Sequence, residues 1–234
     1  MKKVSAVLVI LFMSCGSVAA QGIDLGIRGG ANFATFRGDT NTLSQQVVGN
    51  QGSSDFGRKI GLRVGGFLRF GITEAFSIRP EVTYSQKGTT FEGSASGVIN
   101  GQSVTVEFEA TSSYDYLDIP VLAEYVIPTS GQLQPYLFAG PSLGFSINAE
   151  TEADLTARSA GQSVSETNTS DDDVESTDLG AVLGGGVSYA LQSGNTIFLD
   201  IRYNPSFTSL DSEGDADIQN DVISVGVGYS FSLQ

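Results

Sequence analysis

The composition of this 234-residue chain narrows its function before any motif is considered. The length fits one or two soluble domains, or a single all-β barrel of ordinary size. There is no histidine, so the commonest acid/base group and the commonest metal ligand are both missing. The formal net charge of −14 excludes a protein that binds nucleic acid by neutralising its phosphates.

The first 20 residues have the pattern of a secretory signal peptide. Lys2 and Lys3 form a basic start, and the apolar run at residues 4–13 is too short to span a bilayer as a helix. Val18-Ala19-Ala20 offers small residues before a cleavage point. We therefore predict that residues 1–20 are a cleaved signal peptide and that residues 21–234 form one domain.

Cleavage after Ala20 would remove Cys15, which is the only cysteine. An alternative is a lipoprotein signal acylated at Cys15, but Phe12-Met13-Ser14 lacks the small residues usual before such a cysteine. Losing Lys2 and Lys3 takes the 12 basic residues to ten against 26 acidic ones, a net charge of −16. The predicted mature chain thus has no thiol and is strongly acidic.

The rest of the chain contains eight stretches in which apolar side chains alternate with small or polar ones. Alternation with period two is typical of strands that have one apolar face. In the third stretch Pro80 cannot donate to a ladder, which predicts a β-bulge there. The predicted strands lie at residues 23–33, 60–70, 76–85, 104–125, 137–147, 179–189, 197–203 and 222–234.

The last of these stretches has the clearest pattern. From Ile223 to Leu233 every second residue is large and apolar, and the residues between them are only Gly and Ser. A crowded lumen on one side and lipid on the other would produce this pattern, whereas a water-facing surface normally carries charge. Alone, the strand also allows a less favoured interpretation as the edge of a soluble sandwich. In a closed barrel it would pair with the first strand, residues 23–33, and remove the edges of the sheet.

The connections between the predicted strands alternate strictly between long and short. Barrels of bacterial outer membranes sort their connections in this way, with short turns in the periplasm and long loops outside. In a closed barrel every backbone polar group is paired, so tilted strands of ~9–11 residues can cross the bilayer. The sequence therefore predicts an all-β fold, an eight-stranded antiparallel up-and-down transmembrane β-barrel. Long loops are predicted at residues 36–58, 88–103, 148–177 and 205–220, and short turns at 71–75, 127–134 and 191–195.

Aromatic residues near the short turns indicate where the membrane ends on the periplasmic side. Outer-membrane barrels carry a girdle of such residues at each interface. The girdle predicted here consists of Phe70, Phe76, Tyr125, Tyr136, Tyr189 and Phe231.

Charged side chains follow the predicted inward face. The interior of an eight-stranded barrel is just wide enough for side chains, and an unpaired buried charge is costly, so we expect a paired network that plugs the lumen. The alternative interpretation is a path for small solutes or ions. The expected network consists of Arg28, Arg63, Arg69, Arg79, Glu81, Asp118, Glu124, Asp200 and Arg202, with Asp24 and Asp178 on the same face.

Two acidic stretches in the predicted loops carry oxygen ligands suited to Ca²⁺ or Mg²⁺. One runs from Glu150 to Asp178, and the weak calcium candidates in the other are Asp211, Glu213, Asp215 and Asp217. Ala216 and Val222 stand where a calcium loop has its Gly and Glu, so a solvated acidic surface is favoured and no metal site is predicted. Without His or Cys in the mature chain, Ser/His/Asp and Cys/His catalysis are excluded, and we predict no catalytic residue and no cofactor.

Three stretches resemble the outer-membrane β-barrel domain family of Bacteroidota and related bacteria, which includes PorT-like proteins. The stretches are Gly26-Ile27-Arg28-Gly29-Gly30-Ala31-Asn32-Phe33, Tyr116-Leu117-Asp118-Ile119-Pro120-Val121-Leu122-Ala123-Glu124-Tyr125 and Pro135-Tyr136-Leu137-Phe138-Ala139-Gly140-Pro141-Ser142-Leu143-Gly144. The resemblance covers residues 22–234 and implies an OmpA/OmpX-like eight-stranded barrel in the outer membrane of a Gram-negative cell. It implies the lipid bilayer as partner, and the tie of PorT to a secretion and gliding apparatus leaves open a protein partner at the surface or in such an apparatus.

The sequence thus predicts a non-enzymatic outer-membrane barrel with a structural or surface-interaction role and acidic extracellular loops. Two alternatives stay open, a narrow pore for small solutes or ions and a soluble exported ligand-binding barrel.

Overall fold

The computed structural model describes residues 22–40, 53–99, 101–159, 162–171, 174–210 and 217–233. The predicted signal peptide and the calcium candidates Asp211, Glu213 and Asp215 lie outside the described residues. In these ranges no helix is long and apolar enough to cross a membrane.

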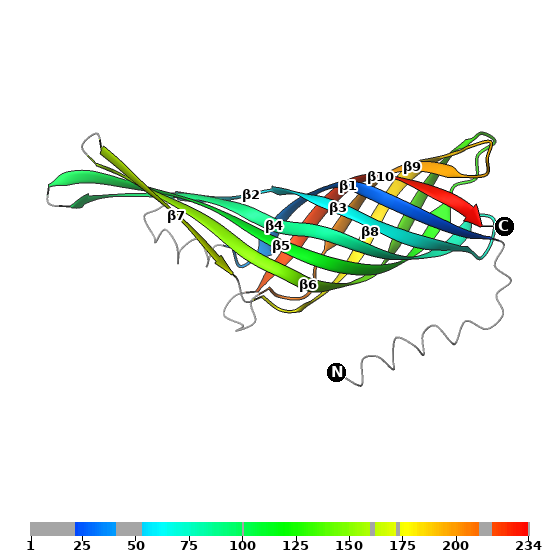
Figure 1. Ribbon diagram of the computed structural model, residues 1–234, viewed down its shortest axis with the longest axis horizontal. Coiled ribbons are helices and arrows are strands. Elements are labelled where there is room, and N and C mark those ends of the chain that lie inside the picture. The colour runs from blue at the N-terminus through cyan, green and yellow to red at the C-terminus, as the bar shows by residue number, and fades with distance from the viewer. Residues whose placement is uncertain are drawn as a thin grey trace, which may run out of the picture.

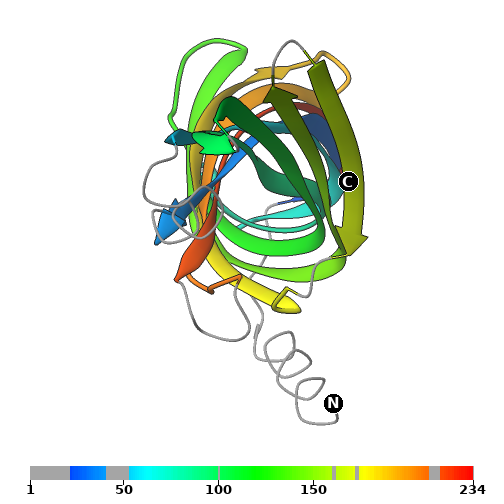
Figure 2. The same cartoon turned by 90° about the vertical axis from the view of Figure 1, so that its left-hand side faces the viewer.

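The described chain folds into ten strands, eight of which close into a ring (Figures 1 and 2). Around the ring the order is β1, β3, β4, β5, β6, β8, β9, β10 and back to β1, and each neighbouring pair is antiparallel. The predicted eight-stranded antiparallel barrel is confirmed. The strands are β1 (Ile23–Gly38), β2 (Ser53–Gly57), β3 (Lys59–Gly71), β4 (Phe76–Ile99), β5 (Gln102–Val126), β6 (Leu133–Ser159), β7 (Gln162–Asp171), β8 (Thr177–Ala190), β9 (Thr196–Pro205) and β10 (Ile218–Leu233).

The first and last ring strands close the barrel. β1 pairs with β10 from Ile23 opposite Leu233 to Gly38 opposite Ile218, so the pairing predicted for the last strand is confirmed. This closure removes the two edges that an open sheet of these strands would expose.

Two of the predicted long loops, 88–103 and 148–177, are largely strand where the structure describes them. The described part of the loop predicted at 36–58 includes the end of β1 and all of β2, and residues 41–52 lie outside the described residues. β4 and β5 form a hairpin that keeps one register from Phe76 opposite Tyr125 to Ile99 opposite Gln102. β6 continues to Ser159 and turns back into β7, and β2 pairs with β4 beside this hairpin. These segments are rich in Gly, Ser and Thr, as loops are, but the strands within their described parts pair with neighbouring strands. The predicted loop boundaries at 36–58, 88–103 and 148–177 are therefore wrong.

Together these segments form a sheet that continues beyond the ring, which we call the projecting sheet (Figure 1). It consists of β2, residues 88–99 of β4, residues 102–113 of β5, residues 150–159 of β6, and β7. One row of it aligns Gly88, Ser113, Glu150 and Asp171 across the four longer strands.

The β-bulge predicted at Pro80 is wrong. Phe67 faces Glu81 and Phe70 faces Ile78, so β3 and β4 keep the same register on both sides of Pro80. The ladder is interrupted there without an inserted residue. A register shift occurs instead between β5 and β6, beside Asp115 and Tyr116.

The outward face of the ring carries exposed apolar side chains, as a lipid-facing wall requires. The predicted girdle residues Phe76, Tyr125, Tyr189 and Phe231 are exposed on this face. Tyr136 is only 2% exposed and packs with Phe138 among the buried residues, so its place in the girdle is wrong. Its position in the alternation of β6 puts it on the inward face, two residues before Phe138.

Candidate functional site: a filled lumen and a projecting sheet

A connected cluster of charged side chains lies in the lumen, with Glu81 at its centre. Glu81 of β4 pairs with Arg202 Nη1 at 2.7 Å, with Arg79 Nε at 2.9 Å and with Arg28 Nη1 at 3.7 Å. These guanidinium groups come from β9, β4 and β1, so one carboxylate ties together three ring strands.

The contacts continue from Glu81 toward two further carboxylates. Asp200 pairs with Arg28 at 2.9 Å and with Arg202 at 3.2 Å. Glu124 pairs with Arg79 and, at 2.9 Å, with Arg69 Nε.

Arg69 also reaches Asp24 at 3.2 Å, which completes a cluster of four arginines and four carboxylates. Its opposite charges are equal in number, and this balance makes burial of the charges tolerable. We call these eight residues the lumen network; they are Arg28, Arg69, Arg79, Arg202, Asp24, Glu81, Glu124 and Asp200.

Aromatic rings pack against the lumen network. The guanidinium carbon of Arg79 lies 4.9 Å from the ring centroid of Phe138 and 5.4 Å from that of Phe67, and Arg202 lies 4.7 Å from that of Phe138. Cation–π contacts of this kind are strongest where water is excluded. The rings belong to a buried cluster that consists of Phe67, Leu122, Tyr136, Phe138, Val182 and Phe198.

Inward glycines leave the room that these side chains occupy. A side chain at Gly26 would collide with the ring of Phe67, and a Cβ atom at Gly226 would lie 2.7 Å from Nη2 of Arg28. The bare Gly and Ser face of the last strand is therefore opposite large side chains from the rest of the ring.

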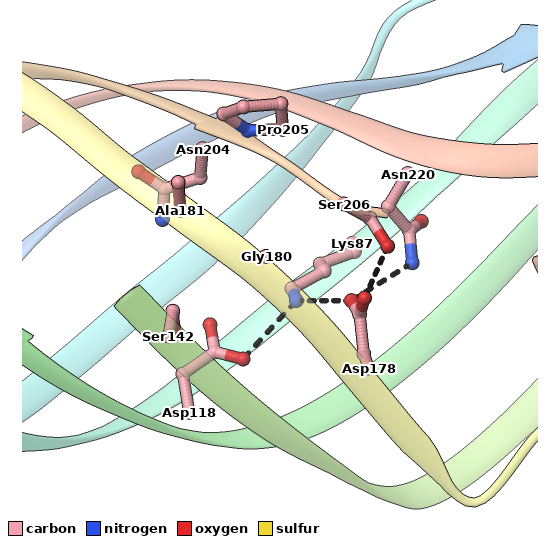
Figure 3. A pocket seen from close by; sticks show the side chains of 10 residues that line it. All are labelled: Lys87, Asp118, Ser142, Asp178, Gly180, Ala181, Asn204, Pro205, Ser206 and Asn220. Carbon is pink, nitrogen blue, oxygen red and sulfur yellow. Dashed lines mark hydrogen bonds and ion pairs between the residues drawn. The ribbon is translucent and has the colours of Figure 1, made fainter. Parts of the chain in front are cut away.

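A second charged group, the Lys87 triad, consists of Lys87, Asp118 and Asp178 (Figure 3). Lys87 Nζ lies 3.1 Å from Asp118 Oδ1 and 2.9 Å from Asp178 Oδ2, and 4.2 Å from the ring centroid of Tyr116. The Ser206 hydroxyl also donates to Asp178. Beside the triad is a cavity of about 20 Å³ that is lined in part by Ser142 and Asn220, which is room for about one water molecule.

Lys87 was not among the residues predicted for the network, although a signal for it exists. Extending the inward alternation of β4 from Ser85 by one step reaches Lys87. The prediction stopped at Ser85 because the following Gly, Ser and Thr residues resemble a loop.

Arg63 behaves differently from the other predicted network residues. It is 1% exposed, and within the described chain no carboxylate forms an ion pair with it. Its Nη1 lies 2.7 Å from the amide of Asn204, whose oxygen accepts the hydrogen bond. The Lys87 triad has a net charge of −1, so Arg63 brings the charges of the triad, the lumen network and itself to zero.

The acidic residues outside the ring are spread over a surface rather than gathered around a point. Among the residues that the structure describes, no group of three or more acidic residues is placed to hold a metal ion. Asp217, the one calcium candidate in the described ranges, is exposed and accepts a hydrogen bond from Gln219 at 3.1 Å.

The two faces of the projecting sheet differ in chemistry. Its outward face continues the lipid-facing wall of the ring but carries carboxylates and hydroxyls. Asp55, Glu92, Glu109 and Asp154 lie directly opposite one another on β2, β4, β5 and β6. Its inward face continues the lumen wall and is mostly apolar on β4, β5 and β6, whereas on β7 Val164 is accompanied by Gln162, Glu166, Asn168 and Ser170.

Comparisons with known proteins agree with this architecture. A model of the family described as outer membrane protein beta-barrel domain matches residues 19–212. No match was found among curated proteins.

Several solved structures match this chain at low sequence identity. Neisserial surface protein A is 16% identical over 88% of this chain and 97% of that chain, with a TM-score of 0.39. Ail, the attachment invasion locus protein of Yersinia pestis, is 14% identical over 90% of this chain and 99% of its own, with a TM-score of 0.37. OprG of Pseudomonas aeruginosa is 13% identical over 91% of this chain and 97% of its own, with a TM-score of 0.43. Since the family model spans well over half of the sequence, this chain belongs to the outer membrane β-barrel domain family and is an outer-membrane protein.

Proposed function

We propose that this protein is a non-enzymatic outer-membrane barrel with a closed lumen, which acts at the cell surface through its projecting sheet. One observation carries the surface role. The outward face changes from apolar to acidic at the same level on three adjacent strands: between Tyr84 and Glu92 on β4, between Leu117 and Glu109 on β5, and between Ile147 and Glu150 on β6. A face that carries carboxylates belongs in water, so this level is the outer boundary of the membrane.

The filled lumen supports the closed state. The lumen network spans the interior from β4 to β9, which lie opposite each other in the ring, and the rings of Phe67, Phe138 and Phe198 pack beside it. No observation in the described ranges favours the alternative of a pore for small solutes or ions. The soluble alternative is set aside because the family is one of outer-membrane proteins.

A non-enzymatic role is supported by the state of the buried carboxylates. Glu81, Glu124 and Asp200 are each held by two or more arginines, so they are not available as acid or base groups. Kinship with PorT-like proteins, and a partner in a secretion apparatus, stay predictions of the sequence resemblance.

Labelling of intact cells tests the surface role. We expect a membrane-impermeant maleimide to label Ser163→Cys in β7 on intact cells, because β7 lies in the projecting sheet. Gln192→Cys, in the short turn between β8 and β9, should be labelled only after the outer membrane is permeabilised. The unsubstituted protein shows any background labelling of Cys15. In detergent, the maleimide should label both variants equally. Labelling of Gln192→Cys alone on intact cells would contradict the proposed orientation.

A further inference from the structure

The apolar inward face of the projecting sheet has no second layer of structure in the described ranges. An antiparallel sheet usually packs its apolar face on a core and exposes the other. Here Leu155 and Val164 are exposed instead. The register of the strands places on this one face Phe56, Phe91, Ala95, Val104, Val106, Phe108, Ala110, Ala153, Leu155, Ala157 and Val164.

Aromatic contacts organise this apolar face. The ring centroids of Phe56 and Phe91 are 4.9 Å apart, and those of Phe91 and Phe108 are 5.7 Å apart. Nearer the ring, Phe36 stacks on Tyr114 at 5.8 Å, so the apolar surface continues to the mouth of the barrel. Phe91 is buried by these contacts and Phe108 is half-buried, whereas Leu155 and Val164 are exposed, so the open part of the apolar face lies on β6 and β7. An exposed apolar patch with a polar rim marks an interaction site.

The charge of the projecting sheet restricts what can bind there. The sheet carries nine acidic residues and one basic residue, a net charge of −8. Four of the carboxylates form the row from Asp55 to Asp154, and like charges directly opposite one another destabilise a sheet. Glu166 lies on the apolar face itself, directly opposite Leu155. Glu166 therefore attracts a cation directly at the apolar face, and the carboxylates of the outward face add to the negative potential around the sheet.

A second copy of the chain does not suit this face. Two sheets of net charge −8 would repel each other. In addition, the face continues the lumen wall, so it is turned toward the space above its own barrel, whereas a second barrel in the same membrane stands to the side. Lipid does not suit it either, because the acidic outward face places the sheet beyond the membrane.

We propose that the apolar inward face of the projecting sheet binds a cationic amphipathic polypeptide segment. The apolar side chains of the segment cover Phe108, Leu155 and their neighbours, and its positive groups are attracted by Glu166 and by the carboxylates of the outward face. This inference rests on the proposed surface role and names the class of partner for it.

The test compares synthetic peptides on the full-length protein in nanodiscs of zwitterionic lipid, with empty nanodiscs as background. The probe alternates Leu and Lys; one matched peptide replaces Leu by Ser at the same charge, and the other replaces Lys by Glu. We expect the Leu/Lys peptide to bind at least about tenfold more tightly than the Ser/Lys peptide, because burial of a few apolar side chains is worth more than 1.4 kcal/mol. The Leu/Glu peptide should not bind at the concentrations at which the Leu/Lys peptide binds. Equal affinities for the two Lys peptides would overturn the proposal.

Two variants locate the bound peptide. Phe108→Ser with Leu155→Ser should lower the affinity of the Leu/Lys peptide about tenfold or more. The matched control is the double variant Thr105→Ser/Thr156→Ser, whose changes lie on the outward face of the same strands. It should keep the affinity for the Leu/Lys peptide within about twofold of the parent. Unchanged binding by the first variant would overturn the proposal.

A charge variant covers the case in which the apolar variant does not fold. Glu109→Gln with Asp154→Asn should weaken binding of the Leu/Lys peptide and flatten its dependence on salt. If this variant bound the Leu/Lys peptide with the same affinity and the same salt dependence as the parent protein, the proposal would be overturned. If Ser163→Cys is labelled on intact cells and the peptides show no preference, the partner class is wrong while the surface role stands.

Discussion

Buried charge is tolerated in this lumen because each arginine of the lumen network meets more than one partner. Arg79 contacts Glu81 and Glu124 and lies within cation–π distance of three aromatic rings. Arg63 has Asn204 in place of a carboxylate, and its charge is balanced by the more distant Lys87 triad. Inward position predicts which residues are buried, but the choice of partner depends on side-chain reach across the ring.

Removing one buried arginine should therefore lower the free energy of unfolding, because the carboxylates that it contacts stay buried without it. We expect Arg79→Met to lower the free energy of unfolding by about 3–5 kcal/mol, because Glu81 and Glu124 stay buried with fewer partners. Arg69→Met is the control, since Arg69 also contacts Glu124 but its side chain is 16% exposed. Urea titration in lipid vesicles measures both variants. A loss at Arg79 no larger than that at Arg69 would contradict the view that burial sets the cost.

At the scale of the element, one long strand serves two environments. The outward face of β4 is apolar beside the membrane and polar beyond it, while its backbone pairing with β5 continues unchanged. The ring portions were predictable because lipid on one side produces strong alternation. Of the projecting portions only that of β5 was predicted, because Val104, Val106 and Phe108 alternate. The others were not, because Gly, Ser and Thr dominate them and resemble a loop.

A Val→Arg substitution on the outward face should destabilise the protein more in the ring than in the projecting sheet. Val227 of β10 is 58% exposed on the lipid-facing wall, and Val98 of β4 is 71% exposed on the projecting sheet. We expect Val227→Arg to cost about 2–4 kcal/mol if it lies at the bilayer midplane. Val98→Arg should stay within about 0.5 kcal/mol, as surface changes in water do. Folding yield in lipid vesicles compares them, and similar yields for both variants would refute the assignment of the boundary.

At the scale of the whole molecule, we propose that the barrel is a filled support for a sheet that acts at the cell surface. The eight alternating stretches predicted the number of ring strands, and the sorting of long and short connections predicted a closed barrel, because outer-membrane barrels sort their connections in this way. The signal for the candidate site was weaker. The inward alternation identifies Arg28, Arg79 and Arg202, but it does not reveal that an apolar face stands above the barrel mouth, since that face arises from pairing between distant segments.

Single-channel recording on the purified protein in planar bilayers tests the central claim most directly. The lumen network and the packed rings of Phe67, Phe138 and Phe198 fill the interior, so the protein should insert without giving stable unitary currents. Stable unitary currents of reproducible size from the purified, folded protein would contradict the closed lumen and show that the barrel is a pore.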